Sequence, residues 1–145
     1  KQAQFNLGLF FLKDKSLDEN YLTAIKWFTL AAQQGVLEAQ YNLGTIYFDG
    51  LGVVQNFKKA FTNYLLSAEK GFEMSQYKLS LMFFNGWGTE ADKIKAFMWA
   101  NIAASKRHEK SIIKRDELLK ILSSEDIQRG QELSLTCFEK KLKNC

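Results

Sequence analysis

Proline is absent from this 145-residue sequence, and histidine and cysteine are scarce, at one and two residues. Because proline interrupts helices, its absence suits a chain that is nearly all helix. The histidine and the cysteines form no cluster with metal-ligand spacing, and no glycine-rich phosphate loop precedes a helix in a βαβ context. No apolar run is long enough to span a bilayer. These absences argue against a metal, a cofactor and membrane insertion.

The composition favours one globular domain over residues 1–145. Hydrophobic residues make up 46% of the chain and aromatic residues 14%, which is enough for a continuous core. The net charge of +4 comes mostly from the region after Lys106, because basic and acidic side chains nearly balance before it. The charge is a mildly basic tail without an aromatic-lined basic stripe, so we expect no nucleic-acid partner.

An internal repeat of 36 residues is the main feature of the sequence. Without a gap, residues 3–8, 39–44 and 75–80 align as AQFNLG, AQYNLG and SQYKLS. Alanines 24, 60 and 96 also coincide, as do tryptophans 27 and 99. Three copies therefore cover about 3–38, 39–74 and 75–107, and a period of this length predicts a solenoid of stacked helix pairs.

Each copy is predicted to form two helices, because its apolar residues recur at helical spacing. We place the first-type helices at about 2–13, 36–49 and 73–85, and the second-type helices at about 18–34, 57–70 and 92–106. Gly8 and Gly44 fall in mid-helix, which costs about 1 kcal/mol relative to alanine, so a neighbouring helix should approach closely there. Gly35 and Gly71 follow second-type helices and should adopt a left-handed conformation.

The sequence repeat breaks after about residue 107, and two further helices are predicted at 108–122 and 124–143. Ser123 and Asp126 are spaced as a capping box. A stripe on the last helix is expected to cover the end of the third copy, and it contains Ile127, Leu135, Phe138 and Leu142. The predicted fold is all-α: a right-handed α/α superhelix of three 36-residue repeats with a C-terminal two-helix cap over about 108–145.

The second copy closely resembles the Sel-one-like repeat (SLR) family, a relative of tetratricopeptide repeats, through AQYNLG, Tyr47, Gly50, Gly52-Val53 and Lys59-Ala60. The third copy repeats the pattern with GWG at 86–88. The first copy departs from it, with Asp14 and Ser16 in place of loop glycines, and Asn20 and Asn56 stand where the family usually has aspartate. The resemblance implies a protein-binding adaptor or scaffold, often in bacterial envelope or signalling assemblies, without chemistry of its own.

In a superhelix of this kind the first helix of each repeat lines the concave face, which the resemblance makes the candidate peptide site. Helical angles place four ladders there: Phe5, Tyr41 and Tyr77; Asn6, Asn42 and Lys78; Leu9, Thr45 and Leu81; Lys13, Asp49 and Asn85. Asparagine can bond a peptide backbone and Lys78 can meet a carboxylate. Packing between adjacent repeats is the alternative for the asparagines and the aromatics. Trp87, between two loop glycines, is a separate candidate whose alternative is packing over the preceding loop.

Catalytic chemistry has little support in the sequence. His108 lies among charged residues, where a solvated histidine is expected. The S-x-x-K pattern of penicillin-recognising serine enzymes occurs at Ser67, Ser75 and Ser111, but its companion motifs S-D-N and K-T-G are absent. We therefore expect a binding adaptor, with structural self-assembly as the alternative and a serine enzyme behind both.

The two cysteines lie eight positions apart, at Cys137 and Cys145. On one straight helix their Cα atoms would be about 12 Å apart, beyond disulfide reach, so a bridge requires the chain to turn back after about Leu142. We favour the disulfide over two free thiols. Paired tail cysteines resemble those of exported family members, which favours a bacterial periplasmic or secreted location over a cytoplasmic one. Lys1 is not an initiator methionine, so an upstream segment is expected, and it could be a signal peptide, further repeats or simply residues beyond the chosen boundary.

Overall fold

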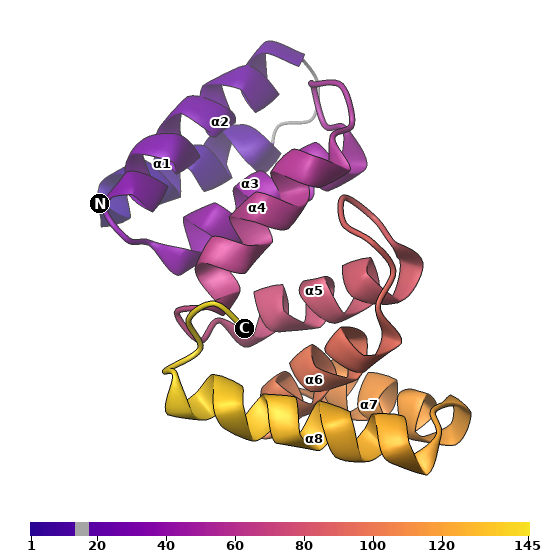
Figure 1. Cartoon of the computed structure of the whole chain (residues 1–145). Coiled ribbons are helices and arrows are strands. Elements are labelled where there is room, and N and C mark those ends of the chain that lie inside the picture. Colours follow the sequence, from indigo (N-terminus) through magenta and orange to yellow (C-terminus); the bar gives the residue numbers. More distant parts are fainter. Residues whose placement is uncertain (14–17) are drawn as a thin grey trace. The chain divides into compact units, whose positions relative to one another are not determined.

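The structure, a computed structural model, describes residues 1–13 and 18–145 and is helical without strands over them (Figure 1). The helices are α1 (Gln2–Lys13), α2 (Asp18–Gln33), α3 (Leu37–Asp49), α4 (Phe57–Ala68), α5 (Glu73–Asn85), α6 (Lys93–Ala104), α7 (Glu109–Ile121) and α8 (Ser124–Glu139). Each predicted helix is present, and only α8 ends well short of its predicted boundary. The loop departures at Asp14 and Ser16 lie outside the described residues. None of the described helices is long and apolar enough to cross a membrane.

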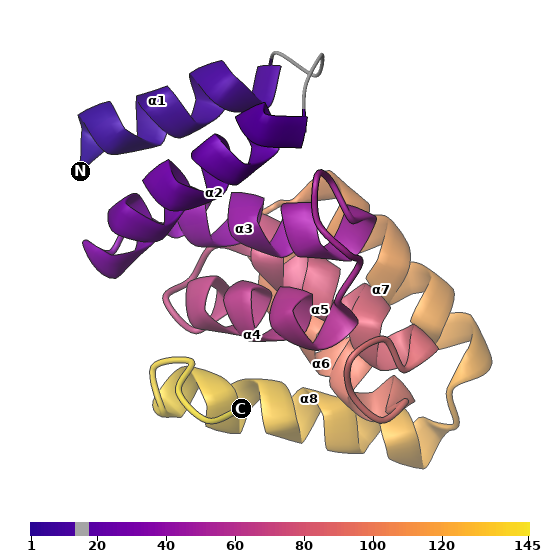
Figure 2. The same cartoon turned by 90° about the horizontal axis from the view of Figure 1, so that it is seen from above.

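The chain divides into two compact units, residues 1–64 and 65–145. In the first unit α2 lies between α1 and α3 (Figure 2). Its core joins Ala24, Phe28 and Ala31 of α2 to Ala39, Leu43 and Ile46 of α3. Because the second helix of one copy and the first helix of the next share this core, neither helix pair completes its core alone, as a solenoid requires. In the second unit α6 packs against α5, α7 and α8.

The mid-helix glycines mark close helix contacts, as predicted. A Cβ atom on Gly8 would lie 2.6 Å from the Phe28 ring, and one on Gly44 would lie 2.6 Å from the Tyr64 ring. The third copy has Ser80 and Ala100 at the equivalent positions. There the Ser80 hydroxyl donates to the carbonyl of Ala96 at 2.7 Å. In the first two copies a large ring on the second helix therefore contacts a glycine on the first helix. In the third copy the second helix has a small residue at this position and the first helix has a serine.

The connections between copies repeat at the same interval. Gly35 and Gly71 have left-handed φ of 83° and 92°, as predicted, and Arg107 adopts the same conformation at 62°. Extended residues then precede α3, α5 and α7, with ψ of 110°, 108° and 108°. The sequence repeat ends near 107, but the structural period continues through α7. The structural period therefore extends one helix beyond the sequence repeat, whereas α8 packs on α6.

The predicted apolar stripe of α8 is wrong for Leu135 and Phe138, whereas Ile127 and Leu142 are half-buried. Leu135 and Phe138 are 66% and 43% exposed, whereas the small residues Gly130, Ser134 and Cys137 are buried. These three have the spacing of Ala96, Ala100 and Ala103 on α6. A Cβ on Gly130 would lie 2.5 Å from the Phe97 ring, so α8 approaches α6 too closely for large side chains on the contact line. The serine half of the predicted capping box is present, because Ser123 Oγ accepts from the Asp126 amide at 3.1 Å.

The C-terminal tail folds back after α8, and Cys137 and Cys145 form a disulfide with Cα atoms 5.3 Å apart. The turn begins just beyond Glu139, where α8 ends, and Lys141, Leu142 and Asn144 have left-handed φ. It therefore starts slightly earlier than the predicted point. The Asn144 amide also donates to the Glu69 carboxylate at 3.0 Å, which ties the tail to the turn after α4.

Candidate functional site

The face of the first-type helices that packing leaves open is the candidate site. On α3, one side is buried in the core that it shares with α2. A second side faces α4, where Tyr64 is fully buried. Thr45 belongs to this second side, because its hydroxyl lies 3.1 Å from the Tyr64 hydroxyl. Asn42 and Asp49 lie on the remaining side, half-buried and exposed. Thr45 therefore takes part in the packing of α3 against α4 as well as lying on a predicted ladder.

The aromatic ladder is engaged in ring contacts within the chain. Phe5 and Tyr41 pack on the second-type helix of their own copy with almost the same geometry, with ring centroids 5.9 and 5.7 Å from Phe28 and Tyr64. Tyr77 instead contacts His108, at 5.6 Å, because Ala100 replaces the aromatic residue of its own copy. The expected packing role is therefore present, but for Phe5 and Tyr41 it joins the two helices of one copy. All three rings remain half-buried, so each keeps an edge at the surface.

Burial sets the protonation of the tyrosines behind this face. It raises the pKa of Tyr64 well above its ordinary value, and the hydrogen bond with Thr45 only partly offsets this. Burial also raises the pKa of Tyr41. Both hydroxyls therefore stay neutral at physiological pH, and the Thr45–Tyr64 contact is a hydrogen bond between uncharged groups.

Two polar positions recur on the open side of every first-type helix. The inner position is Asn6, Asn42 and Lys78, and the outer position is Lys13, Asp49 and Asn85. All three outer residues and Asn6 are exposed, whereas Asn42 and Lys78 are half-buried. Asn6 accepts from the Gln2 amide at 3.2 Å, and Asn85 donates to the Leu81 carbonyl at 2.8 Å. We call these six residues the polar positions.

A hollow of about 280 Å³ on α1 brings together three predicted ladder residues, Asn6, Leu9 and Lys13. Phe10 completes its lining and was not among the predicted ladder residues. A second hollow that the ladders did not include lies along α4, lined by Asn56, Lys58, Lys59, Thr62 and Asn63.

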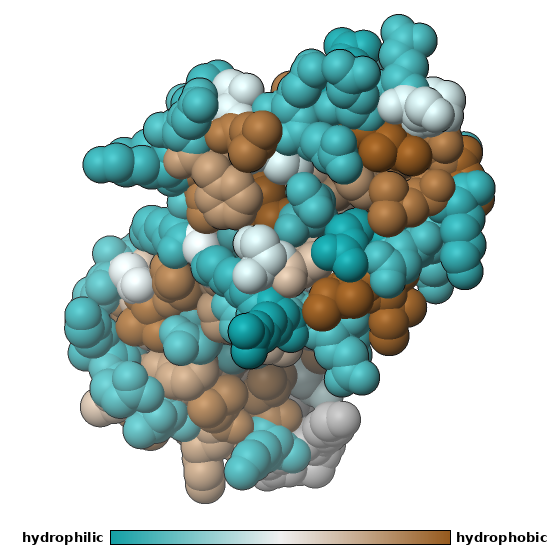
Figure 3. Space-filling model, turned by 90° about the horizontal axis from the view of Figure 1, so that it is seen from below, coloured by the Kyte–Doolittle hydropathy of each residue, from teal (hydrophilic) through white to brown (hydrophobic). Residues whose placement is uncertain are grey.

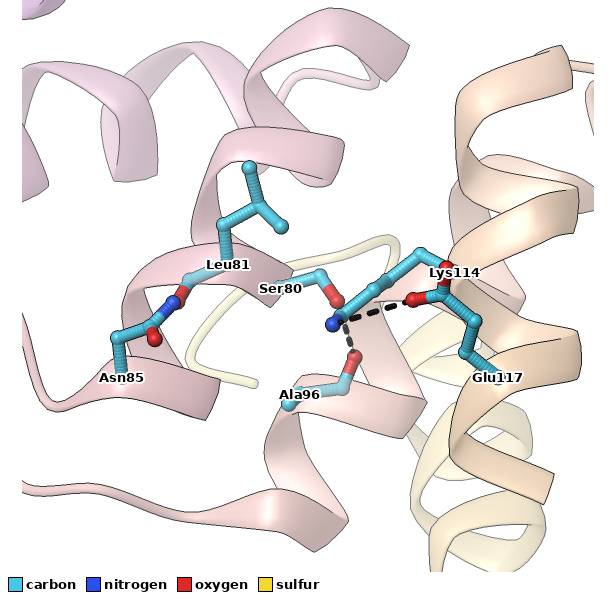
Figure 4. Close-up of polar contacts among 6 residues, drawn as sticks. All are labelled: Ser80, Leu81, Asn85, Ala96, Lys114 and Glu117. Atoms are coloured by element: carbon cyan, nitrogen blue, oxygen red, sulfur yellow. Dashed lines mark hydrogen bonds and ion pairs between the residues drawn. The ribbon is translucent and has the colours of Figure 1, made fainter. Parts of the chain in front are cut away.

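In the second unit α7 adds a lysine at the position equivalent to Lys78. The ammonium group of Lys114 lies 3.9 Å from the centroid of the Phe84 ring and 3.5 Å from the Glu117 carboxylate. Figure 4 shows Lys114 reaching from α7 toward α5, with Leu81 and Asn85 on the other side of α5. The ladder leucine and asparagine of α5 therefore point away from this charged pair.

Trp87 is half-buried in the loop between α5 and α6, between Gly86 and Gly88, which both have a left-handed φ of 71°. Its amide donates to the Met82 carbonyl at 3.0 Å, so the backbone of the loop is anchored to the end of α5.

The serines of the S-x-x-K patterns are inaccessible. Ser67, Ser75 and Ser111 are each 0% exposed. The Ser111 hydroxyl lies 2.7 Å from Nδ1 of His108, and this contact joins the residue before α7 to the first turn of that helix. Because Ser111 is buried, its hydroxyl cannot reach a substrate. Across residues 1–13 and 18–145, no three histidine, cysteine or acidic side chains gather closely enough to hold a metal ion.

Helix pairs in phase, joined by left-handed connectors and packed through small residues, define a helical-repeat solenoid. The chain belongs to the Sel1 repeat family: the family model matches residues 1–36, 37–72 and 74–108. These bounds have the predicted period with slightly shifted starting points. No curated protein matches the sequence significantly.

Two solved structures resemble the chain. One is a protective antigen of uropathogenic Escherichia coli strains that displays an SLR fold, with 29% sequence identity and a TM-score of 0.90. That match covers 97% of this chain but only 30% of the antigen. The other is a Sel1 repeat protein from Oxalobacter formigenes, with 33% identity and a TM-score of 0.72 over 80% of this chain and 87% of that protein. Sel1 repeat proteins are generally interaction scaffolds and typically not enzymes.

Proposed function

We propose that this protein is an adaptor that binds a peptide or protein partner along the open side of its first-type helices. The observation that carries the proposal is the contrast between faces of the same helix. Packing occupies the other sides of α3, whereas the polar positions are repeated from copy to copy and remain at least partly accessible. Polar side chains at a regular interval suit a partner with a regular spacing of its own, such as an extended peptide backbone.

The chemistry of the polar positions favours a peptide with acidic side chains or a free carboxylate. Asn6 and Asn42 can both donate to and accept from a main chain, and Lys78 offers a charged donor. The hollow beside Asn6 adds the apolar surface of Leu9 and Phe10 to the ammonium group of Lys13. Polar contacts would set the register of the bound peptide, and the apolar wall would add affinity.

The test compares capture of partners by the full chain and by a double variant, Asn42→Ala with Lys78→Ala. The matched control makes the same two kinds of change at exposed positions of α2, Gln33→Ala with Lys26→Ala. We expect the first variant to lose most of a captured partner and the control to retain it, with circular dichroism and melting unchanged in both. Equal affinity of the two variants would contradict the proposed site.

A structural role, in which copies of the chain contact one another, is the second candidate function. It is favoured by the exposed apolar side chains Leu135 and Phe138 on α8. Sedimentation velocity over a wide concentration range separates the candidates. A monomer that does not change with concentration would count against self-assembly and leave the adaptor role in place.

The disulfide supports a location outside the cytoplasm, because such bonds persist in oxidising compartments. We propose a bacterial periplasmic or secreted protein. Intact mass of the protein isolated from its native host, under non-reducing conditions, should be lower by two hydrogens than the mass after reduction. Alkylation of both thiols without reduction would weaken the bridge and the proposed location together.

A further inference from the structure

Helix α7 presents the same ladder positions as the first-type helices before it. The connector that precedes it is left-handed at Arg107 and extended at His108, as the earlier connectors are at their equivalent residues. A shift of 36 residues, the repeat length, therefore carries the four ladder residues of α5 onto α7. They become Ile113, Lys114, Glu117 and Ile121, which are called the fourth rung below.

The apolar members of the fourth rung are exposed, with Ile113 at 53% and Ile121 at 55%. Ile121 holds the outer position, which is exposed in every copy. In the first three copies this position holds the polar residues Lys13, Asp49 and Asn85. Apolar patches reach the surface among hydrophilic residues on the face of the molecule shown in Figure 3. On α7, therefore, an isoleucine replaces a polar residue at a position that contacts solvent throughout.

The exposure of Ile113 follows from the packing of α8. In earlier copies Phe5 and Tyr41 hold the same position, and each packs on a ring of the second-type helix of its own copy. Helix α8 packs on α6 instead. The arrangement of helices within the second unit thus leaves Ile113 at the surface, one residue from the inner position.

The inner position of the fourth rung is a lysine whose ammonium group already pairs with a carboxylate. The side chain of Lys114 is 14% exposed, and its Nζ lies 3.9 Å from the centroid of the Phe84 ring and 3.5 Å from Glu117 (Figure 4). The ring attracts the ammonium group and holds it in place. Glu117 is 59% exposed, and ion pairs with so much solvent contact contribute at most about 1 kcal/mol. The Glu117 carboxylate can therefore move aside at little cost.

The inner position also changes in charge along the chain. It is asparagine on α1 and α3, at Asn6 and Asn42, but lysine on α5 and α7. An amide both donates and accepts, whereas an ammonium group only donates and carries a positive charge. Among the ladder residues of α5 and α7 only Glu117 is acidic, and Lys114 pairs with it. The charge of the second unit thus favours an anionic group on the partner.

We infer that the fourth rung binds an acidic and apolar peptide segment, which rests on the proposed adaptor function and specifies the chemistry of the partner. The carboxylate of the segment takes the place of the Glu117 carboxylate beside Lys114, and its apolar side chains cover Ile113 and Ile121. Lys114 is then a specificity-determining residue, and Glu117 is an internal competitor for its ammonium group.

The spacing of the two isoleucines specifies the order of residues in the bound segment. Eight residues of helix separate them, which is about 12 Å along the axis, and about four residues of an extended chain span the same length. Alternate side chains of an extended chain face the same side. The segment therefore has an acidic residue two positions from an apolar residue on either side.

The test uses two arrays of short synthetic peptides with blocked ends. One array has the pattern leucine-x-glutamate-x-leucine, with x varied, and the other has glutamine in place of glutamate. Affinities of the best binders are measured by fluorescence anisotropy. We expect the full chain to prefer the glutamate peptides. Ile121→Ser should lower the affinity for peptides of both arrays, because it removes an apolar contact.

The two charge variants should change the affinity for glutamate peptides in opposite directions. Lys114→Met keeps most of the side-chain stem and should lower that affinity by about tenfold. Glu117→Gln removes the competitor and should raise it by about threefold. The matched controls are Lys93→Met and Glu125→Gln, at exposed positions in the first turns of α6 and α8, and they should leave it unchanged.

A full chain that does not distinguish glutamate from glutamine peptides, or binds neither, would overturn the inference. So would a Glu117→Gln variant that binds glutamate peptides no more tightly than the full chain does. Because Glu117 is exposed, this second outcome can be measured even if Lys114→Met does not fold. Binding without a glutamate preference that Asn42→Ala with Lys78→Ala abolishes would leave the adaptor function standing while the fourth rung fails.

Discussion

Replacing Gly44 by alanine tests whether a close helix contact explains a glycine in mid-helix. The new Cβ would lie 2.6 and 2.7 Å from two carbons of the Tyr64 ring, and Tyr64 is 0% exposed. Overpacking of this kind costs about 1–3 kcal/mol, and the better helix propensity of alanine returns about 1 kcal/mol. The hydrogen bond to Thr45 hinders movement of the ring. We therefore expect the overpacking cost to lie in the upper part of its range, at about 2–3 kcal/mol, and the net loss in the free energy of unfolding to be about 1–2 kcal/mol.

The sign of the same change should reverse once the ring is removed. In a Tyr64→Ala background the Cβ of residue 44 has room, and only helix propensity remains. Gly44→Ala should then stabilise the protein by about 1 kcal/mol. The third copy already combines small residues at both equivalent positions, Ser80 and Ala100, which shows that the fold accepts this pairing.

Urea unfolding followed by circular dichroism measures all four proteins of this double-mutant cycle. The expected coupling between the two positions is about 2–3 kcal/mol. A Gly44→Ala change with the same sign and size in both backgrounds would refute the reasoning, because the glycine would then be unrelated to the ring.

Three further predictions concern the connectors and the buried tyrosine. Arg107→Gly should stabilise the protein by about 1 kcal/mol, because Arg107 has a left-handed φ of 62° that glycine adopts without strain. Gly35→Ala should destabilise the protein by a similar amount, although no atom lies within 4 Å of the new Cβ. Urea midpoints that move in the opposite directions would contradict this prediction. Thr45→Val should cost about 1–3 kcal/mol by leaving the Tyr64 hydroxyl without that partner, whereas Thr45→Ser should cost less, and equal melting curves would count against the hydrogen bond. Because burial holds the folded-state pKa of Tyr64 above its ordinary value of 10.0, the unfolded chain loses this proton first. The contribution of Tyr64 to the free energy of unfolding should thus be constant below pH 10 and fall above it, and Tyr64→Phe should reduce that fall in alkaline unfolding experiments.

Local signals in the sequence were enough to predict the helices and their connectors. The 36-residue period, the apolar spacing, and glycine at 35 and 71 each depend on neighbours along the chain, and helical pitch or left-handed backbone follows from them directly. The disulfide was predictable for the same reason, because Cys137 and Cys145 are close in sequence and only a reversal of the tail was needed. The repeat also implied that each helix pair would pack on the next.

Tertiary contacts decided which face of each helix is buried and which is exposed. Sequence hydrophobicity assigned Leu135 and Phe138 of α8 to the core, yet close approach to the Phe97 ring selects Gly130 instead. Helical angle alone placed Thr45 with the open ladders, but its hydroxyl forms a hydrogen bond with the hydroxyl of buried Tyr64. In each case the outcome depends on the shape and distance of a partner far along the chain, which residue type and period do not specify.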